Sequence, residues 1–234
     1  MKRPAFATSV VVAGLVGSLL TSSASLVAIQ LDVREFVSQV WFEGMPYEEG
    51  NRYDASVVPT LLQLLADPTA EEQRANVVVL LGIIGDERAA EPMINFISQG
   101  TAELSMTQYR ARSSAIMSLG SLIAKSQNER ALSYLIDSMS PQSWQEREIA
   151  WNSPFAASME ERDLQLSKMA ILGLALSGHP TAGEALRPLQ DPPETAADAA
   201  FQAEVSDIVS EALAVHSIVA ADGLAAYYAR QRRP

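Results

Sequence analysis

The chain has 234 residues, enough for one domain with a sizeable core, and its 28 acidic and 17 basic side chains give a net charge of −11. It has no cysteine, which excludes disulfide bonds, thiolate metal sites and cysteine nucleophiles. Its two histidines lie 37 positions apart and lack the spacing of a helical zinc site, so we expect no metal and no cofactor. The acidic balance argues against a nucleic-acid partner, because phosphate binding requires basic surface.

The first residues have the layout of an export signal. Lys2 and Arg3 precede an uncharged stretch, 4–31, whose centre is apolar. The small residues at 22–24 predict cleavage after Ala24, so 1–24 is interpreted as a signal peptide. The alternative is an uncleaved anchor to about residue 31, since a stretch of this length can cross the roughly 30 Å of a bilayer core. We therefore expect a periplasmic or secreted protein or, in the alternative, a membrane-anchored protein that faces away from the cytoplasm.

Residues 32–50 are expected to form an N-terminal capping helix and turn. Apolar side chains recur at helical spacing within 33–42, and Trp41, Met45 and Tyr47 form an apolar knot after them. At the other end of the chain, 223–230 contains Tyr227 and Tyr228, is followed by Arg232 and Arg233, and is expected to form a polar C-terminal end. We expect each of these two stretches to cover one end of the helical domain.

The chain beyond residue 31 is predicted to be all-α, because its apolar residues recur every three or four positions without sustained alternation. One segment recurs within 54–231, and its copies align on Gly82, Gly120, Gly173 and Leu213, which lie 38, 53 and 40 positions apart. This spacing predicts about four helix pairs with one insertion. A glycine inside a helix costs up to about 1 kcal/mol relative to alanine, so the column predicts a close approach between neighbouring helices.

The insertion is placed at about 140–163, which has no helix-pair counterpart in the other copies. It contains Trp144, Trp151 and Phe155 outside the repeated helices. Aromatic residues in such a segment are either packed into the core or presented to a partner. Trp144 and Trp151 are therefore candidate partner-binding residues, with packing as the alternative.

Several short motifs resemble bacterial HEAT repeats of the short kind also found in phycobilisome lyase-like proteins. The stretch 57–68 resembles a HEAT first helix ending in Asp-Pro, Arg74 follows Asp67 by seven positions, and 81–86 reads Leu-Gly-Ile-Ile-Gly-Asp. The match covers about 54–190 well and 198–230 loosely. It implies a right-handed α-α solenoid with a concave inner face. The inner helices it implies begin near Glu71, Met106, Leu164 and Val205, and the outer helices near Asp54, Glu87, Asn128 and Pro180.

Counting back from the glycine column selects residues on the implied inner face. Arg74 and Arg112 lie eight positions before a glycine, Asn76 lies six before, and Arg110 is close to Arg112. Together they predict a cationic spot that can hold a carboxylate or an acidic partner segment. The alternative is that Arg74 and Arg112 bond to the turns between repeats, as family arginines do.

No catalytic motif accompanies the repeats. The sequence has no Gly-x-Ser-x-Gly, no phosphate loop and no calcium loop, and neither histidine has a local triad around it. We therefore predict an exported, non-catalytic scaffold or protein-interaction module of the bacterial cell envelope, which contacts another protein through its concave face or its insertion. The alternatives are a lyase-like enzyme or chromophore-handling chaperone, suggested by the resemblance alone, and a membrane-anchored structural component.

Overall fold

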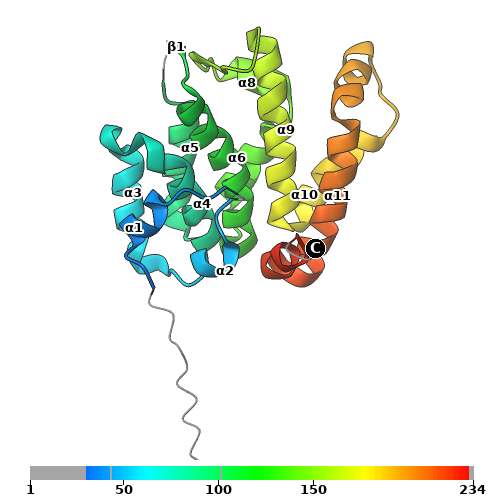
Figure 1. Cartoon of the computed structure of the whole chain (residues 1–234). Helices are drawn as coiled ribbons and strands as arrows, with labels where there is room; N and C mark the ends of the chain where they lie inside the picture. The colour runs from blue at the N-terminus through cyan, green and yellow to red at the C-terminus, as the bar shows by residue number, and fades with distance from the viewer. Residues whose placement is uncertain (1–29, 43, 101, 232–234) are drawn as a thin grey trace, which may run out of the picture. The chain divides into compact units, whose positions relative to one another are not determined.

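The computed structural model describes residues 30–42, 44–100 and 102–231 (Figure 1). The expected signal peptide, 1–24, lies outside these residues. All the elements below belong to the unit that begins at Leu31.

The described chain is almost entirely helical, which confirms the all-α prediction. Its α-helices are α1 (Val33–Ser38), α2 (Tyr47–Gly50), α3 (Val58–Ala66), α4 (Arg74–Ile84), α5 (Ala90–Ser98), α6 (Met106–Ser126), α7 (Glu129–Asp137), α8 (Pro141–Glu146), α9 (Met159–Ser177), α10 (Pro180–Leu186) and α11 (Ala196–Gln231). Short 3-10 helices lie at Ala55–Val57, Pro68–Gln73, Glu87–Ala89 and Arg187–Gln190. Two strands of two residues each, β1 (Ala102–Glu103) and β2 (Trp151–Asn152), pair in parallel.

The helices lie in two rows. The helices α4, α6, α9 and α11 pack side by side in chain order and form what we call the long row. The helices α3, α5, α7 and α10 form the short row, and each packs on the long-row helix with which it is paired along the chain. One apolar core runs between the rows, because each helix buries one stripe of its side chains.

Glycine backbones set the separation of the long-row helices. A Cβ added to Gly120 of α6 would clash with the carbonyl oxygen of Gly173 in α9, and one added to Gly82 of α4 would lie 2.6 Å from the carbonyl oxygen of Ser118. Both neighbouring groups are backbone, so no side-chain movement can relieve such a contact. The close approach expected from the glycine column is therefore present between α4, α6 and α9.

Two long-row helices begin earlier than expected from the resemblance, and their capping residues explain why. Ser158 caps α9 by accepting a hydrogen bond from the Glu161 amide at 3.3 Å, so the helix begins at Met159 instead of near Leu164. Thr195 and Asp198 exchange hydrogen bonds ahead of α11, each accepting from the other's amide, so that helix begins at Ala196 instead of near Val205. Such reciprocal caps satisfy amides that the first helical turn leaves unpaired.

The stretch 140–163 contains α8, β2 and the first turn of α9. The strand β2 pairs with β1, which precedes α6, and this pairing ties the stretch to the turn between α5 and α6. Trp144 and Trp151 have no exposed surface, whereas Phe155 is 55% exposed. The expected insertion is therefore packed onto the helix rows by its two tryptophans.

The N-terminal helix α1 is shorter than expected. It ends at Ser38, because Gln39 adopts an extended conformation, and it buries Val33, Phe36 and Val37. Val40 and Phe42, expected on the same helix, are 75% and 97% exposed.

Candidate functional site

Arg74 and Arg112, two of the predicted partner-binding residues, are bonded to turns between helices. The Arg74 guanidinium donates to the carbonyl oxygen of Asp67 at 2.8 Å, and that of Arg112 donates to the carbonyl oxygen of Gln99 at 2.7 Å. Both guanidinium groups lie near the ring of Phe96, at 5.8 and 5.1 Å from its centroid. Burial and the nearby Arg74 lower the pKa of Arg112 to about 10. These arginines hold the turns that follow α3 and α5.

Asn76 and Arg110 do not complete a cationic spot with them. The Asn76 side-chain amide donates to the carbonyl oxygens of Val37 and Gln39, both at 2.9 Å, and so fixes the end of α1 against α4. Arg110 is exposed on α6, and its side chain has no ion pair among the residues described. Of the four residues, only Arg110 has an exposed side chain for a partner to contact.

The indoles of Trp144 and Trp151 have internal partners. The Trp144 Nε1 donates to the carbonyl oxygen of Ser138 at 2.8 Å, and the Trp151 Nε1 donates to that of Ile97 at 3.0 Å. The packing alternative therefore applies to both tryptophans, since neither indole reaches the surface.

A buried ion pair, Arg162–Asp163, lies outside the residues predicted from the sequence. The Arg162 Nη2 lies 2.6 Å from the Asp163 Oδ1, and its Nη1 donates to the carbonyl oxygen of Ile149 at 3.0 Å. The two side chains are 3% and 0% exposed, and burial raises the pKa of Asp163. Arg162 thus holds the stretch before α9 by bonding to its backbone, as Arg74 and Arg112 hold shorter turns. The sequence signal that could have predicted this pair is an arginine directly followed by an aspartate at the end of the expected insertion.

The two histidines also have structural partners. The His216 Nε2 lies 2.9 Å from the carbonyl oxygen of His179, and its ring packs against Gly183 of α10, where a Cβ would lie 2.7 Å from the imidazole. These contacts join α10 to α11. The described residues contain no group of three or more histidine, aspartate or glutamate side chains placed to hold a metal ion.

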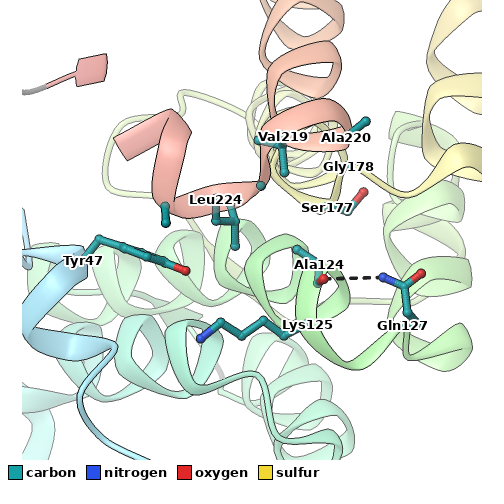
Figure 2. Close-up of a pocket in the computed structure, with 11 residues that line it drawn as sticks. Tyr47, Ala124, Lys125, Gln127, Ser177, Gly178, Val219, Ala220 and Leu224 are labelled. Carbon is teal, nitrogen blue, oxygen red and sulfur yellow. Dashed lines mark hydrogen bonds between the residues drawn. The ribbon is translucent and has the colours of Figure 1, made fainter. Parts of the chain in front are cut away.

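The last part of α11 does not end the long row as a polar cover, which is what the sequence suggested for 223–230. The helix bends at Gly223, whose φ of 80° and ψ of 168° are almost restricted to glycine. No atom lies within 4 Å of a Cβ built there, so the glycine is needed for the backbone direction and not for space. Residues 224–231, which we call the C-terminal segment, turn back over the ends of the long-row helices (Figure 2).

The C-terminal segment joins a second apolar cluster, separate from the main core. Leu224 is 4% exposed and packs with Ile83 of α4, Leu176 of α9 and Tyr47 of α2. The ring of Tyr228 stacks on that of Tyr47, with centroids 4.8 Å apart and an interplanar angle of 17°. The C-terminal segment therefore meets α2 over the long row. Sequence periodicity could not predict this meeting, because it depends on the bend at Gly223.

A cavity of about 390 Å³ lies beside this segment, between the ends of α6 and α9 and the bend of α11 (Figure 2). Lys125 is its only charged lining residue in the described chain. The Lys125 Nζ donates to the Asn51 Oδ1 at 2.6 Å and lies 5.9 Å from the centroid of the Tyr47 ring. Burial lowers the pKa of Lys125. Because Lys125 already has these partners, it helps fix α2 against α6.

A smaller apolar cavity of about 150 Å³ lies on the other side of the segment. It is lined by Val79 and Ile83 of α4, Met117 of α6, Leu176 of α9 and Tyr228 of the segment, together with serines of α6. Apolar side chains of three neighbouring long-row helices therefore form one groove, which we call the long-row groove, and Tyr228 lines it.

A third hollow, of about 510 Å³, opens between α9 and α11 away from the bend. It is lined by Glu160, Glu161, Leu164, Gln165, Lys168 and Glu204. An ion pair crosses it, with the Lys168 Nζ 3.3 Å from the Glu204 Oε2. We call it the acidic groove, since three of its six lining residues are glutamates.

No protein-family model, curated protein or solved structure matches this chain. Within the described ranges, α11 is the one helix that is long and apolar enough to cross a membrane by length and composition.

Proposed function

We propose that this chain is an exported HEAT-like repeat protein that binds another protein along the long row. The observation that carries the proposal is the open face of α6 and α9, where half-exposed or exposed side chains recur at steps of three and four residues. They are Arg110, Ser113, Ser114 and Met117 on α6, and Glu161, Leu164, Gln165, Lys168 and Leu172 on α9. A row of paired helices presents such a face as one continuous surface, which is how repeat proteins bind extended partners.

Two features of the fold support the HEAT type of repeat. Helices alternate between the two rows in chain order, and Arg74 bonds to the turn at Asp67 that its spacing suggested. Arg74 and Arg112 hold turns, and the contact between His216 and His179 joins two helices, so we assign these side chains to stability. Binding is assigned to the open face because its side chains remain accessible.

The chemistry of the open face favours a partner segment with basic and apolar residues. Glutamates line the acidic groove around Leu164, and the whole chain carries a net charge of −11. Charge complementarity of this kind speeds association and selects partners. Lys168 and Arg110 carry two positive charges against the three glutamates of the groove, so this surface stays negative.

A photo-crosslinking experiment in intact cells tests the binding surface. A crosslinking amino acid replaces Lys168 on α9 or, as the matched control, Arg130 on the exposed side of α7. We expect one protein to be captured from position 168 and not from position 130. Equal capture from both positions, or capture from neither, would contradict the proposed binding face.

The export proposal is tested separately by the mature N-terminus. Mass spectrometry of the protein isolated from the cell envelope should give a chain that begins at Ser25. Recovery with Met1 from carbonate-extracted membranes would favour the anchored form instead, and recovery with Met1 from the soluble cytosolic fraction would overturn export.

A further inference from the structure

The C-terminal segment has the pattern of a helical ligand. Leu224, Tyr227 and Tyr228 stand at positions i, i+3 and i+4, and all three belong to or pack against the second apolar cluster. Amphipathic helices that dock into apolar grooves present their anchors at this spacing. The face away from the cluster is exposed, at Ala225, Ala229 and Arg230.

The long-row groove supplies a matching receptor. Ile83, Met117 and Leu176 come from three successive long-row helices and converge at the segment. Tyr47 of α2 provides one further wall, through its stack with Tyr228. The groove and its occupant thus show which chemistry fits: a leucine and two aromatic rings on one face of a short helix.

The segment packs on the second apolar cluster and has open space beside it. Cavities of about 390 and 150 Å³ flank it, and it is joined to the rest of α11 through Gly223. The ion pair Arg230–Asp222, the one that the segment makes with a described residue, is exposed and local, so it adds little to the attachment. The main core that packs the two rows includes no residue of the segment, so the rows do not depend on its contacts.

We propose that the long-row groove is a docking site for a short amphipathic helix of a partner protein, with leucine and aromatic anchors at i, i+3 and i+4. The C-terminal segment is then an internal occupant that the partner displaces. A tethered occupant competes at an effective concentration in the millimolar range, so it weakens binding of any outside helix. This inference rests on the proposed function, since it names the partner chemistry for one end of the same face.

The test uses a fluorescently labelled peptide of residues 222–231 and the full chain. Leu224→Ser with Tyr228→Ala in the chain vacates the groove, and we expect this variant to bind the peptide at least tenfold more tightly than the wild type by fluorescence anisotropy. Adding Met117→Glu to the vacated variant places a charge in the groove and should abolish that gain. A peptide of scrambled sequence is the matched control for the ligand.

A second variant protects the test against misfolding. Gly223→Val disfavours the bend and leaves every groove residue unchanged, so it too should increase peptide affinity. The proposal is overturned when variants with wild-type circular dichroism bind the peptide no more tightly than the wild type does, or no more tightly than they bind the scrambled peptide. A wild-type dimer with exchanged segments would also overturn it, in favour of a second copy as occupant. Crosslinking from position 168 stands apart from these results, because it probes the acidic groove.

Discussion

The part of the long row from α4 to α9 and the part beyond α9 are built differently. Between α4, α6 and α9 the helices touch through glycines within the helices, and buried arginines bond to the turns. Beyond α9 the equivalent of the glycine is Leu213, residues 191–200 are all exposed, and α11 buries only six of its 36 residues. The closest approach of α9 and α11 moves to the end of α9, where a Cβ on Gly178 would lie 2.9 Å from the Ala220 amide.

This difference explains where the hollows lie. Glycines in the C-terminal halves of α4, α6 and α9 bring these three helices together within their lengths. The contact at Gly178, by contrast, comes after the last residue of α9 and holds α9 and α11 together there. The acidic groove opens at the other end of that pair. The acidic groove therefore lies in the part of the long row where the glycine column has been replaced by Leu213.

The largest expected effect follows from breaking the buried ion pair. Arg162→Met leaves Asp163 buried and unpaired and removes the bond to the carbonyl oxygen of Ile149, so we expect a loss of about 3–5 kcal/mol in the free energy of unfolding. Urea denaturation measures this loss in the free energy of unfolding. The double variant Arg162→Met/Asp163→Leu is the control and should recover most of the loss. A single variant within about 1 kcal/mol of the wild type would show that the pair does not stabilise this region.

A glycine substitution in the tight part of the row should cost somewhat less. Gly120→Leu forces a side chain against the backbone of Gly173, so we expect a loss of about 3 kcal/mol and a lower Tm. Gly50→Ala is the control, since its Cβ would meet side-chain atoms and no backbone, at 3.1 Å from Ile83 and 3.4 Å from Leu80. An unchanged Tm for Gly120→Leu would contradict the close packing of α6 and α9.

The smallest expected effect is a pH dependence at the turn before α5. The Arg88 side chain donates to the Asp86 carboxylate, and this hydrogen bond holds the pKa of Asp86 below its ordinary value. A lowered folded-state pKa gives stability that is present above the unfolded-state pKa and is lost as the pH falls through the folded-state value. The difference in unfolding free energy between the wild type and Asp86→Ala should therefore shrink below about pH 4. A difference that stays constant from pH 6 to pH 3 would refute this assignment.

The sequence predicted the features that depend on local periodicity. The helices and the glycine contacts follow from residue spacing along one chain segment. The bond from Arg74 to its turn was only the alternative that the family resemblance implied. Asn76 was placed on the right helix, but its partners lie 37 and 39 positions away, where periodicity gives no information.

The bend at Gly223 shows why the remaining contacts could not be predicted from the sequence. A single glycine within a pattern of helical spacing gives no indication of whether the helix continues or turns, and the turn decides that Tyr228 meets Tyr47. The long-row groove depends on that meeting. Trp144 and Trp151 illustrate the same limit, since composition fitted a packed and an exposed tryptophan equally well until their partners at Ser138 and Ile97 were known.

Hydrogen exchange followed by mass spectrometry tests the central contrast most directly. Amides of α6 around Gly120 should exchange only through global unfolding, because glycine contacts and the core enclose them on both sides. Amides of the C-terminal segment should exchange orders of magnitude faster, through local opening at Gly223. Equal protection in the two regions would contradict the account, since it would make the segment as firmly packed as the row it covers.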